Sequence, residues 1–266
     1  MKTTPSNKEY KVKSQMNSNS QTTVSGGTGP YRLGVASAFM MDVIILIQII
    51  VFMVAPPPYD GTALDWFMLF QKNKFIGLID IEFLMIVYTI LSIPISLALY
   101  SLLKQVKPCW MAIYLALSLV GVMCFIAARP AIELLYLSNG YVVAGTDAQR
   151  AVILAAGEAK LATFHGTAFH ISYILGSVTG LIISLVILRA NIFSKATAYV
   201  RIASSVFDFG LFVPVIGTYI SILSVLFLFS WNIMIARRLF QLGKDPSKEK
   251  ANQIDNGLLA IPDHSN

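Results

Sequence analysis

The sequence predicts an all-α, polytopic membrane protein in which six helices cross the bilayer and both chain termini lie in the cytoplasm. Three observations lead to this fold class. Hydrophobic residues make up 56% of the 266 positions and charged residues only 13%, whereas soluble domains have about 25% charged residues. The apolar residues are gathered in runs long enough for a helix to cross a hydrocarbon core of about 30 Å, which takes about 20 residues. Lysine and arginine are concentrated at alternate ends of these runs.

The apolar runs define the expected helices. The first ends at Pro56-Pro57-Pro58, because proline cannot continue a helix. The second contains Pro94, where we expect a kink. The fifth and sixth are joined at Pro214 with almost no loop. The six predicted spans are 33–55, 76–103, 109–128, 167–188, 199–213 and 216–235.

The segments between and around the spans are more polar. Residues 1–29 and 244–266 have no apolar periodicity, and we expect them to be disordered cytoplasmic tails on a transmembrane domain of residues 30–243. Residues 62–74 contain large apolar side chains in a run too short to cross, which favours an interfacial helix or an aromatic anchor. Thr146 and Gln149 match a capping box, so a helix should begin there and run to about Ala162 outside the membrane or at its interface.

The distribution of cations predicts the orientation. Six spans place both termini on one side, and that side carries fifteen lysines and arginines in the two tails and the loops near 104–107 and 189–201. The opposite side carries five. Because cytoplasmic loops are enriched in Lys and Arg, the sequence predicts cytoplasmic termini and a multi-pass protein of the plasma membrane.

The order of these elements resembles a known family. A second span ending in LALYSLLKQV, a long outer segment between the third and fourth spans, and a last span with Pro214, Gly217 and Trp231 are similar to the bacterial and archaeal membrane proteins grouped as domain of unknown function 4386. The resemblance covers about residues 30–243. It implies a six-helix fold and a membrane location, and it transfers no catalytic residue.

Four carboxylates lie within the predicted spans: Asp42, Asp80, Glu82 and Asp208. An acid at mid-membrane costs about 2.5–3.5 kcal/mol on insertion scales, so each should face the bundle interior, find a partner or be protonated. Asp42 and Asp208 fit an ion pathway and structural hydrogen bonding equally well. Asp80 and Glu82 lie near the outer end of their span, where their carboxylates can reach the headgroup region. On one helix they would diverge by roughly 200° and could not share a proton.

Arg201 shares a helix face with Asp208, seven residues later, with Ser204 between them. The rise of about 10.5 Å is too long for direct contact on a straight helix. Either Arg201 and Asp208 pair through a relay or across helices, or Arg201 extends to the cytoplasmic headgroups while Asp208 bonds to a neighbouring helix. The second interpretation is favoured, because long basic side chains near a helix end usually extend to the interface.

Small residues recur every four positions in the fourth span. This small-residue seam consists of Ala168, Ser172, Gly176, Gly180 and Ser184. Small side chains let helix backbones approach closely in lipid. Packing within one chain is the favoured explanation, and a homo-oligomer formed through the fourth span is the alternative.

No pattern indicates catalysis, a cofactor or nucleic-acid binding. His165 and His170 are five apart and point about 140° from each other on a helix, which disfavours a metal site. Cys109 and Cys124 form no metal or disulfide motif, and we expect buried reduced thiols. Two classes of function therefore remain. The first is a non-enzymatic membrane protein that binds partners or has a structural role, and the second is a small proton- or ion-coupled transporter that uses the intramembrane carboxylates.

Overall fold

The computed structural model describes residues 29–214 and 216–244, and regular structure in these ranges is helical. The predicted disordered tails lie outside these ranges, except for Gly29 and Lys244, which belong to the first and last helices. The helices are α2 (Gly29–Val54), α3 (Ala63–Lys72), α4 (Lys74–Asp80), α5 (Phe83–Leu103), α6 (Pro108–Ala127), α7 (Ala131–Val143), α8 (Asp147–Phe164), α9 (Thr167–Arg189), α10 (Lys195–Phe209) and α11 (Gly217–Lys244), with a 3-10 turn at Gly210–Phe212.

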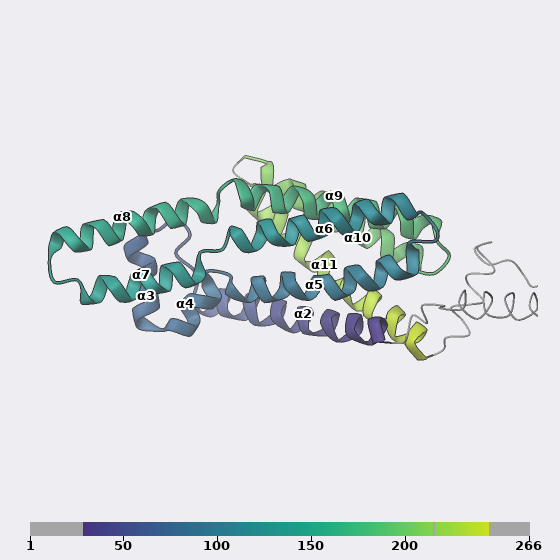
Figure 1. Ribbon diagram of the computed structural model, residues 1–266, viewed down its shortest axis with the longest axis horizontal. Helices are drawn as coiled ribbons and strands as arrows, with labels where there is room; N and C mark the ends of the chain where they lie inside the picture. The colour runs from purple at the N-terminus through teal and green to yellow at the C-terminus, as the bar shows by residue number, and fades with distance from the viewer. Residues whose placement is uncertain (1–28, 215, 245–266) are drawn as a thin grey trace, which may run out of the picture.

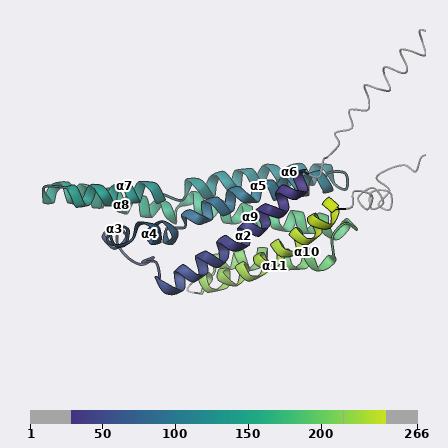
Figure 2. The ribbon, with the colours of Figure 1, turned by 90° about the horizontal axis from the view of Figure 1, so that it is seen from below.

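Six helices, which run along the long dimension of the molecule (Figures 1 and 2), form a closed ring in the described chain. Each packs against the next in the order α2, α5, α6, α9, α10, α11, and α11 packs back against α2. The apolar core of this ring includes Met41, Leu99, Met111, Ile183 and Ile235, each at most 3% exposed. The described chain ends lie together at one end of the ring, with the α5–α6 and α9–α10 connections (Figure 1).

By length and composition, five helical segments of the described chain can cross a membrane. They are Gly29–Val54, Phe83–Leu103, Pro108–Val143, Asp147–Arg189 and Ile220–Lys244. The prediction of an all-α, multi-pass membrane protein is therefore confirmed at this level. α10, the helix of the predicted fifth span, has 15 residues and is about 22 Å long.

Two of these segments are much longer than a bilayer. The α6–α7 segment has 36 residues and the α8–α9 segment 43, or about 54 and 64 Å of helix. A hydrocarbon core of about 30 Å cannot contain them. Consequently α7 and α8 extend past the ring as an antiparallel hairpin, with the short helices α3 and α4 packed against α7 (Figure 1). We call α3, α4, α7 and α8 the outer module.

The outer module has an apolar core of its own. Trp66, Phe67 and Phe70 of α3 are at most 1% exposed and pack with Leu134 of α7 and Phe164 of α8. α3 therefore buries most of its aromatic side chains within the protein, although an aromatic anchor in the membrane interface was one expectation for this segment. Thr146 caps α8 as predicted, because its hydroxyl accepts a hydrogen bond from the Gln149 backbone N–H at 3.2 Å, but the Gln149 side chain accepts from the Gly145 N–H at 3.0 Å and not from that of Thr146, so the full capping box does not form.

The second expected span, 76–103, is divided in two. α4 ends at Asp80, Glu82 adopts a left-handed conformation with φ 63°, and α5 begins at Phe83. The helix continues through Pro94, where the sequence predicted a kink. Hydropathy did not reveal the break, because Asp80 and Glu82 are flanked by apolar residues on both sides.

Candidate functional site

The first candidate site is a group of polar side chains inside the ring. The Asp42 carboxylate on α2 accepts a hydrogen bond from the Asn232 amide on α11, with Nδ2 and Oδ1 3.0 Å apart. Asp42 is 8% exposed and Asn232 is fully buried. The half-buried Tyr88 of α5 faces Asn232 and lies within electrostatic reach of Asp42, Arg201 and Asp208. Thus four helices of the ring bring polar groups to one interior region.

Arg201 turns into this interior. Its Nη1 donates to the Ser204 hydroxyl at 3.2 Å, and its guanidinium lies over the Trp231 ring, 5.3 Å from the ring centroid. Its Nη2 donates to the Gly176 carbonyl of α9 at 3.4 Å. The favoured expectation that Arg201 extends to the cytoplasmic headgroups was wrong, because partners on α9, α10 and α11 hold the side chain. Asp208 interacts with Ser224 of α11, in line with its expected contact to a neighbouring helix.

The small-residue seam contacts two different neighbours. A Cβ added at Gly180 would overlap the Ser205 hydroxyl and lie 2.9 Å from Arg201 Nε, both on α10. The backbone of Ser172 instead lies beside Gly121 of α6. A Cβ at Gly176 meets no atom of the described chain within 4 Å. Ser184 is fully buried and Ala168 half-buried, so part of the seam packs within the chain.

The second candidate site is an ion pair at the junction of the ring and the outer module. Glu82 lies at the break between α4 and α5, and its Oε2 is 2.6 Å from Arg129 Nη2. The Arg129 side chain is fully buried, and its guanidinium also lies over the rings of Phe125, Phe164 and Phe169, at 4.1, 4.7 and 5.1 Å. The other Glu82 oxygen accepts a hydrogen bond from the Tyr59 hydroxyl at 3.1 Å.

Tyr59 and Asp65, which lie outside the predicted spans, both have shifted acidity. Burial raises the pKa of Tyr59, and the negative charge of Glu82 raises it further, so the phenol stays protonated and donates to that carboxylate. Asp65 shows the opposite shift. Its pKa is lowered because the carboxylate accepts hydrogen bonds from the Thr62 backbone N–H and hydroxyl, both at 2.8 Å.

Asp80, the neighbouring predicted site residue, is fully buried at the end of α4. Neither of its carboxylate oxygens has a hydrogen-bond partner among residues 29–214 and 216–244. The helix break separates Asp80 from Glu82, so these two acids have different surroundings.

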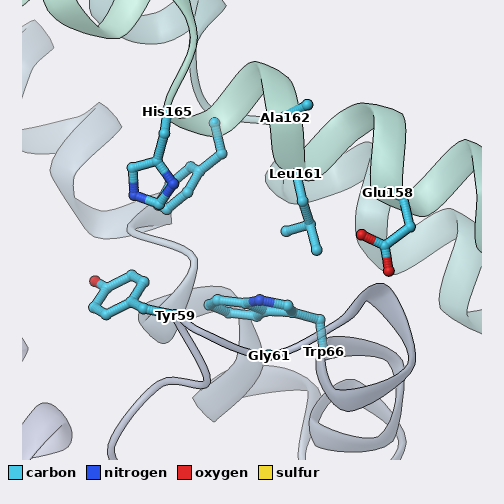
Figure 3. A pocket seen from close by; sticks show the side chains of 8 residues that line it. Tyr59, Gly61, Trp66, Glu158, Leu161, Ala162 and His165 are labelled. Carbon is cyan, nitrogen blue, oxygen red and sulfur yellow. The ribbon is translucent and has the colours of Figure 1, made fainter.

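A pocket opens beside the ion pair, between α3, α8 and the loop that precedes α3 (Figure 3). Its volume is about 250 Å³. We call it the aromatic pocket, because four of its lining side chains are rings. The lining residues are Tyr59, Gly61, Trp66, Glu158, Leu161, Ala162, Phe164 and His165.

Sequence reasoning missed several members of these sites. Tyr88 is uncharged, and nothing in the local pattern separates it from packing residues. Asn232 is an amide inside a predicted span, which is itself an uncommon and detectable signal. Sequence reasoning used Arg129 only as one of the five cations counted on the side opposite the termini. Cys109 is exposed in the structure and Cys124 is only half-buried, so the expectation of two buried thiols was wrong.

The fold and these sites define a multi-pass, all-helical membrane protein with polar groups inside its helical ring. Comparisons with family models, curated proteins and solved structures gave no match for this chain.

Proposed function

We propose that the chain crosses the plasma membrane six times, with α10 as the fifth crossing along the chain and with both termini in the cytoplasm. Two observations support this proposal. α10 completes the ring between α9 and α11, so a helix outside the bilayer at this place would leave the ring open to lipid. The cation bias of fifteen to five puts the end that holds both termini on the cytoplasmic side.

We infer that the protein is a non-enzymatic membrane protein and that its outer module binds a partner protein. The observation that supports this role best is the α7–α8 hairpin. It extends beyond the ring, packs against α3 through the module's own apolar core, and exposes large apolar side chains. A hairpin that served only to cover the ring would have no reason to extend so far from it.

The exposed apolar side chains lie near the tip of the hairpin. Val142 is 57% exposed, Val143 81% and Val152 70%. Tyr136, further down α7, is 77% exposed. Apolar groups gathered on a protruding surface are typical of protein interaction sites.

The experiment is site-specific photocrosslinking in intact cells. A photoreactive amino acid at Val143 should give one discrete adduct with a partner. Val142→Asp together with Val152→Asp should abolish that adduct, because buried unpaired charges oppose association. The matched control is Val142→Ile with Val152→Ile, which keeps the tip apolar and should retain the adduct. No adduct from Val143, or an adduct that the two aspartates leave unchanged, would reject this role for the tip.

A second candidate function is proton- or ion-coupled transport. One observation favours it: Asp42, Arg201 and Asp208, from two helices, each lie within electrostatic reach of Tyr88 inside the ring. Charged side chains inside a membrane bundle commonly mark ion pathways. A purely structural acid should tolerate replacement by Asn, which keeps hydrogen bonding and removes the charge.

The test of transport uses reconstituted vesicles with an internal pH dye. Asp42→Asn and Asp208→Asn should each abolish proton flux driven by a transported solute while the protein remains folded. If a broad set of solutes produces no flux with the wild-type protein, or if both Asn variants match it, transport is excluded in favour of partner binding.

Two further expectations stay predictions. The chain resembles the family named domain of unknown function 4386, and we expect the members of that family to have the same six-helix ring. A homo-oligomer through α9 would have to use Ala168 and Gly176, because Gly180 is already packed against α10.

A further inference from the structure

Arg201 is a cation inside the ring whose hydrogen bonds are long. A guanidinium has five N–H donors, and its charge-assisted hydrogen bonds are usually about 2.7–2.9 Å long. Arg201 instead donates at 3.2 Å to the Ser204 hydroxyl and at 3.4 Å to the Gly176 carbonyl. Its Nε is buried and has no hydrogen-bond partner among the described residues. The donors of this side chain are therefore largely unused.

Arg201 also has no carboxylate within ion-pair distance in the described chain. Asp208, on the same helix, is within electrostatic reach of Arg201 but interacts with Ser224. Arg129 is different, because Glu82 lies 2.6 Å from its guanidinium. A cation inside a membrane bundle normally has a partner. Arg201 is therefore suited to bind a negatively charged ligand.

Two more donors lie beside Arg201. Ser205 is fully buried and Trp231 is 6% exposed, and neither the Ser205 hydroxyl nor the Trp231 indole N–H has a hydrogen-bond partner among the described residues. The Ser205 hydroxyl and Arg201 Nε border the same point of α9, at Gly180. The centroid of the Trp231 ring lies 5.3 Å from the guanidinium carbon. An indole N–H can only donate, so this group of side chains favours a ligand that accepts.

The space for such a ligand lies beside Gly176. A Cβ added at Gly176 meets no atom of the described chain within 4 Å, and the Gly176 carbonyl is the acceptor of the longer Arg201 hydrogen bond. At Gly180, one turn later, Ser205 and Arg201 fill the corresponding space. Gly176 and Arg201 are both half-buried. The space is therefore accessible, and it borders the end of the guanidinium.

We propose that Arg201, Ser205 and Trp231 bind a small anion, such as chloride, in the space beside Gly176. An anion supplies both a counter-charge for the guanidinium and an acceptor for the N–H and O–H groups, which are costly to bury without partners.

This inference goes beyond partner binding by the outer module. It does not depend on transport either, because an anion can bind at equilibrium without being carried across the membrane. The ligand chemistry has two possible sources. The anion can be a free inorganic ion or the phosphate of a membrane lipid, since both accept the same hydrogen bonds.

The first experiment is a chloride titration of the full chain, measured by the line width in chlorine NMR. The protein is purified in a maltoside detergent and in a gluconate buffer, so that no small inorganic anion competes. The protein should broaden the chloride line saturably, and bromide should reverse the broadening. The absence of saturable broadening would overturn the proposal, and so would broadening that bromide leaves unchanged.

Filling the space tests its position. Gly176→Leu puts a side chain there and should weaken chloride binding at least about tenfold. The matched control is Ala168→Leu, which adds bulk to the same seam about two turns away and should leave chloride binding unchanged. Thermal unfolding confirms that both variants are folded. Unchanged chloride binding by Gly176→Leu would overturn the placement of the anion.

Ser205→Ala separates a ligand donor from a structural group. Because the Ser205 hydroxyl has no partner in the described chain, its removal should not lower the unfolding midpoint in chloride-free buffer. Chloride binding should nevertheless weaken several-fold, and Trp231→Phe, which keeps a ring, should have the same effect. Wild-type chloride affinity in both variants would show that these donors are not ligands.

The charge is tested by two arginine substitutions. Arg201→Gln should abolish chloride binding, whereas Arg237→Gln, which removes an exposed cation from α11, should leave it unchanged. Equal effects of the two would show that general charge attracts chloride and would overturn the site. If Arg201→Gln does not fold, the comparison of Gly176→Leu with Ala168→Leu decides.

Asp208→Asn separates anion binding from transport. Its negative charge is within electrostatic reach of Arg201 and opposes an anion there, so its removal should strengthen chloride binding. The same substitution should abolish flux if the protein is a transporter, so the two hypotheses fail separately. Weaker chloride binding by Asp208→Asn would overturn the assignment of Arg201.

A comparison with nanodiscs identifies the source of the anion. Discs of phosphatidylcholine supply lipid phosphates without a net charge, whereas maltoside micelles supply none. Equal chloride binding in both would support a free ion as the ligand. Chloride binding that is kept in micelles and lost in the discs would identify lipid phosphate as the occupant of the same site.

Discussion

Gly180 lies where α9 comes closest to α10. An added Cβ would overlap Ser205, so only glycine fits between the two helices. Gly176, one turn earlier, has open space where its Cβ would be. The sequence pattern gave both glycines the same role, because they occupy equivalent positions in one four-residue repeat.

The difference between the two glycines follows from helix geometry. A step of four residues turns about 400° around an α-helix, so each member of such a repeat is displaced about 40° from the one before. Over the five members of the small-residue seam the displacement adds up to roughly 160°. One neighbour cannot cover so wide an arc. Accordingly, the seam lies beside α6 near Ser172 and beside α10 at Gly180.

We predict that Gly180→Leu destabilises the protein and that Gly176→Leu does so far less. Forcing a larger side chain into a packed contact typically costs about 1–3 kcal/mol or more. The thermal unfolding midpoint in detergent should therefore fall much further for Gly180→Leu than for Gly176→Leu. Equal losses for the two variants would mean that both glycines face a packed neighbour.

At the scale of the helical elements, the break between α4 and α5 is the feature that hydropathy did not predict. Hydropathy predicted one span over 76–103, whereas the structure has two helices there and only Phe83–Leu103 is long and apolar enough to cross. The left-handed residue at the break, Glu82, has its partners on other elements: Arg129 lies 47 residues later and Tyr59 lies 23 residues earlier. No local window contains such contacts. Isolated residues in the left-handed region cost about 1–2 kcal/mol for L-amino acids, so tertiary contacts have to hold Glu82 there.

We predict an asymmetric response when this ion pair is broken. Glu82→Gln leaves the Arg129 side chain, which is 0% exposed, as a buried charge without a counter-ion, and this should cost about 3–5 kcal/mol. Arg129→Met should cost less, because the Glu82 side chain is 21% exposed and can be hydrated. The double variant should be more stable than the sum of the two losses implies, since it leaves no unpaired charge. Denaturant unfolding in detergent measures all three, and strictly additive losses would show that the two residues do not act as a pair.

At the scale of the whole molecule, composition and hydropathy predicted the fold class, and the repeated polar connections predicted most helix ends. They did not predict the outer module as a separate body. Its core joins Trp66 and Phe67 of α3 to Leu134 of α7 and Phe164 of α8, which are distant in sequence. The polar interior was predicted in part, because intramembrane acids stand out in a sequence, whereas Tyr88 becomes notable only in the folded structure.

The number of membrane crossings decides which side the C-terminus lies on, and cysteine labelling measures it. In a background of Cys109→Ser and Cys124→Ala, we predict that a membrane-impermeant maleimide labels Ala148→Cys, at the tip of the hairpin, in intact cells. Gln105→Cys, in the turn between α5 and α6, should be labelled only after lysis, because the cation bias puts this turn in the cytoplasm. Asp255→Cys tests α10 itself. If α10 crosses the membrane, the C-terminal segment is cytoplasmic and Asp255→Cys is labelled only after lysis, like Gln105→Cys. If α10 does not cross, the chain has five crossings, and Asp255→Cys is labelled from outside while Gln105→Cys remains protected.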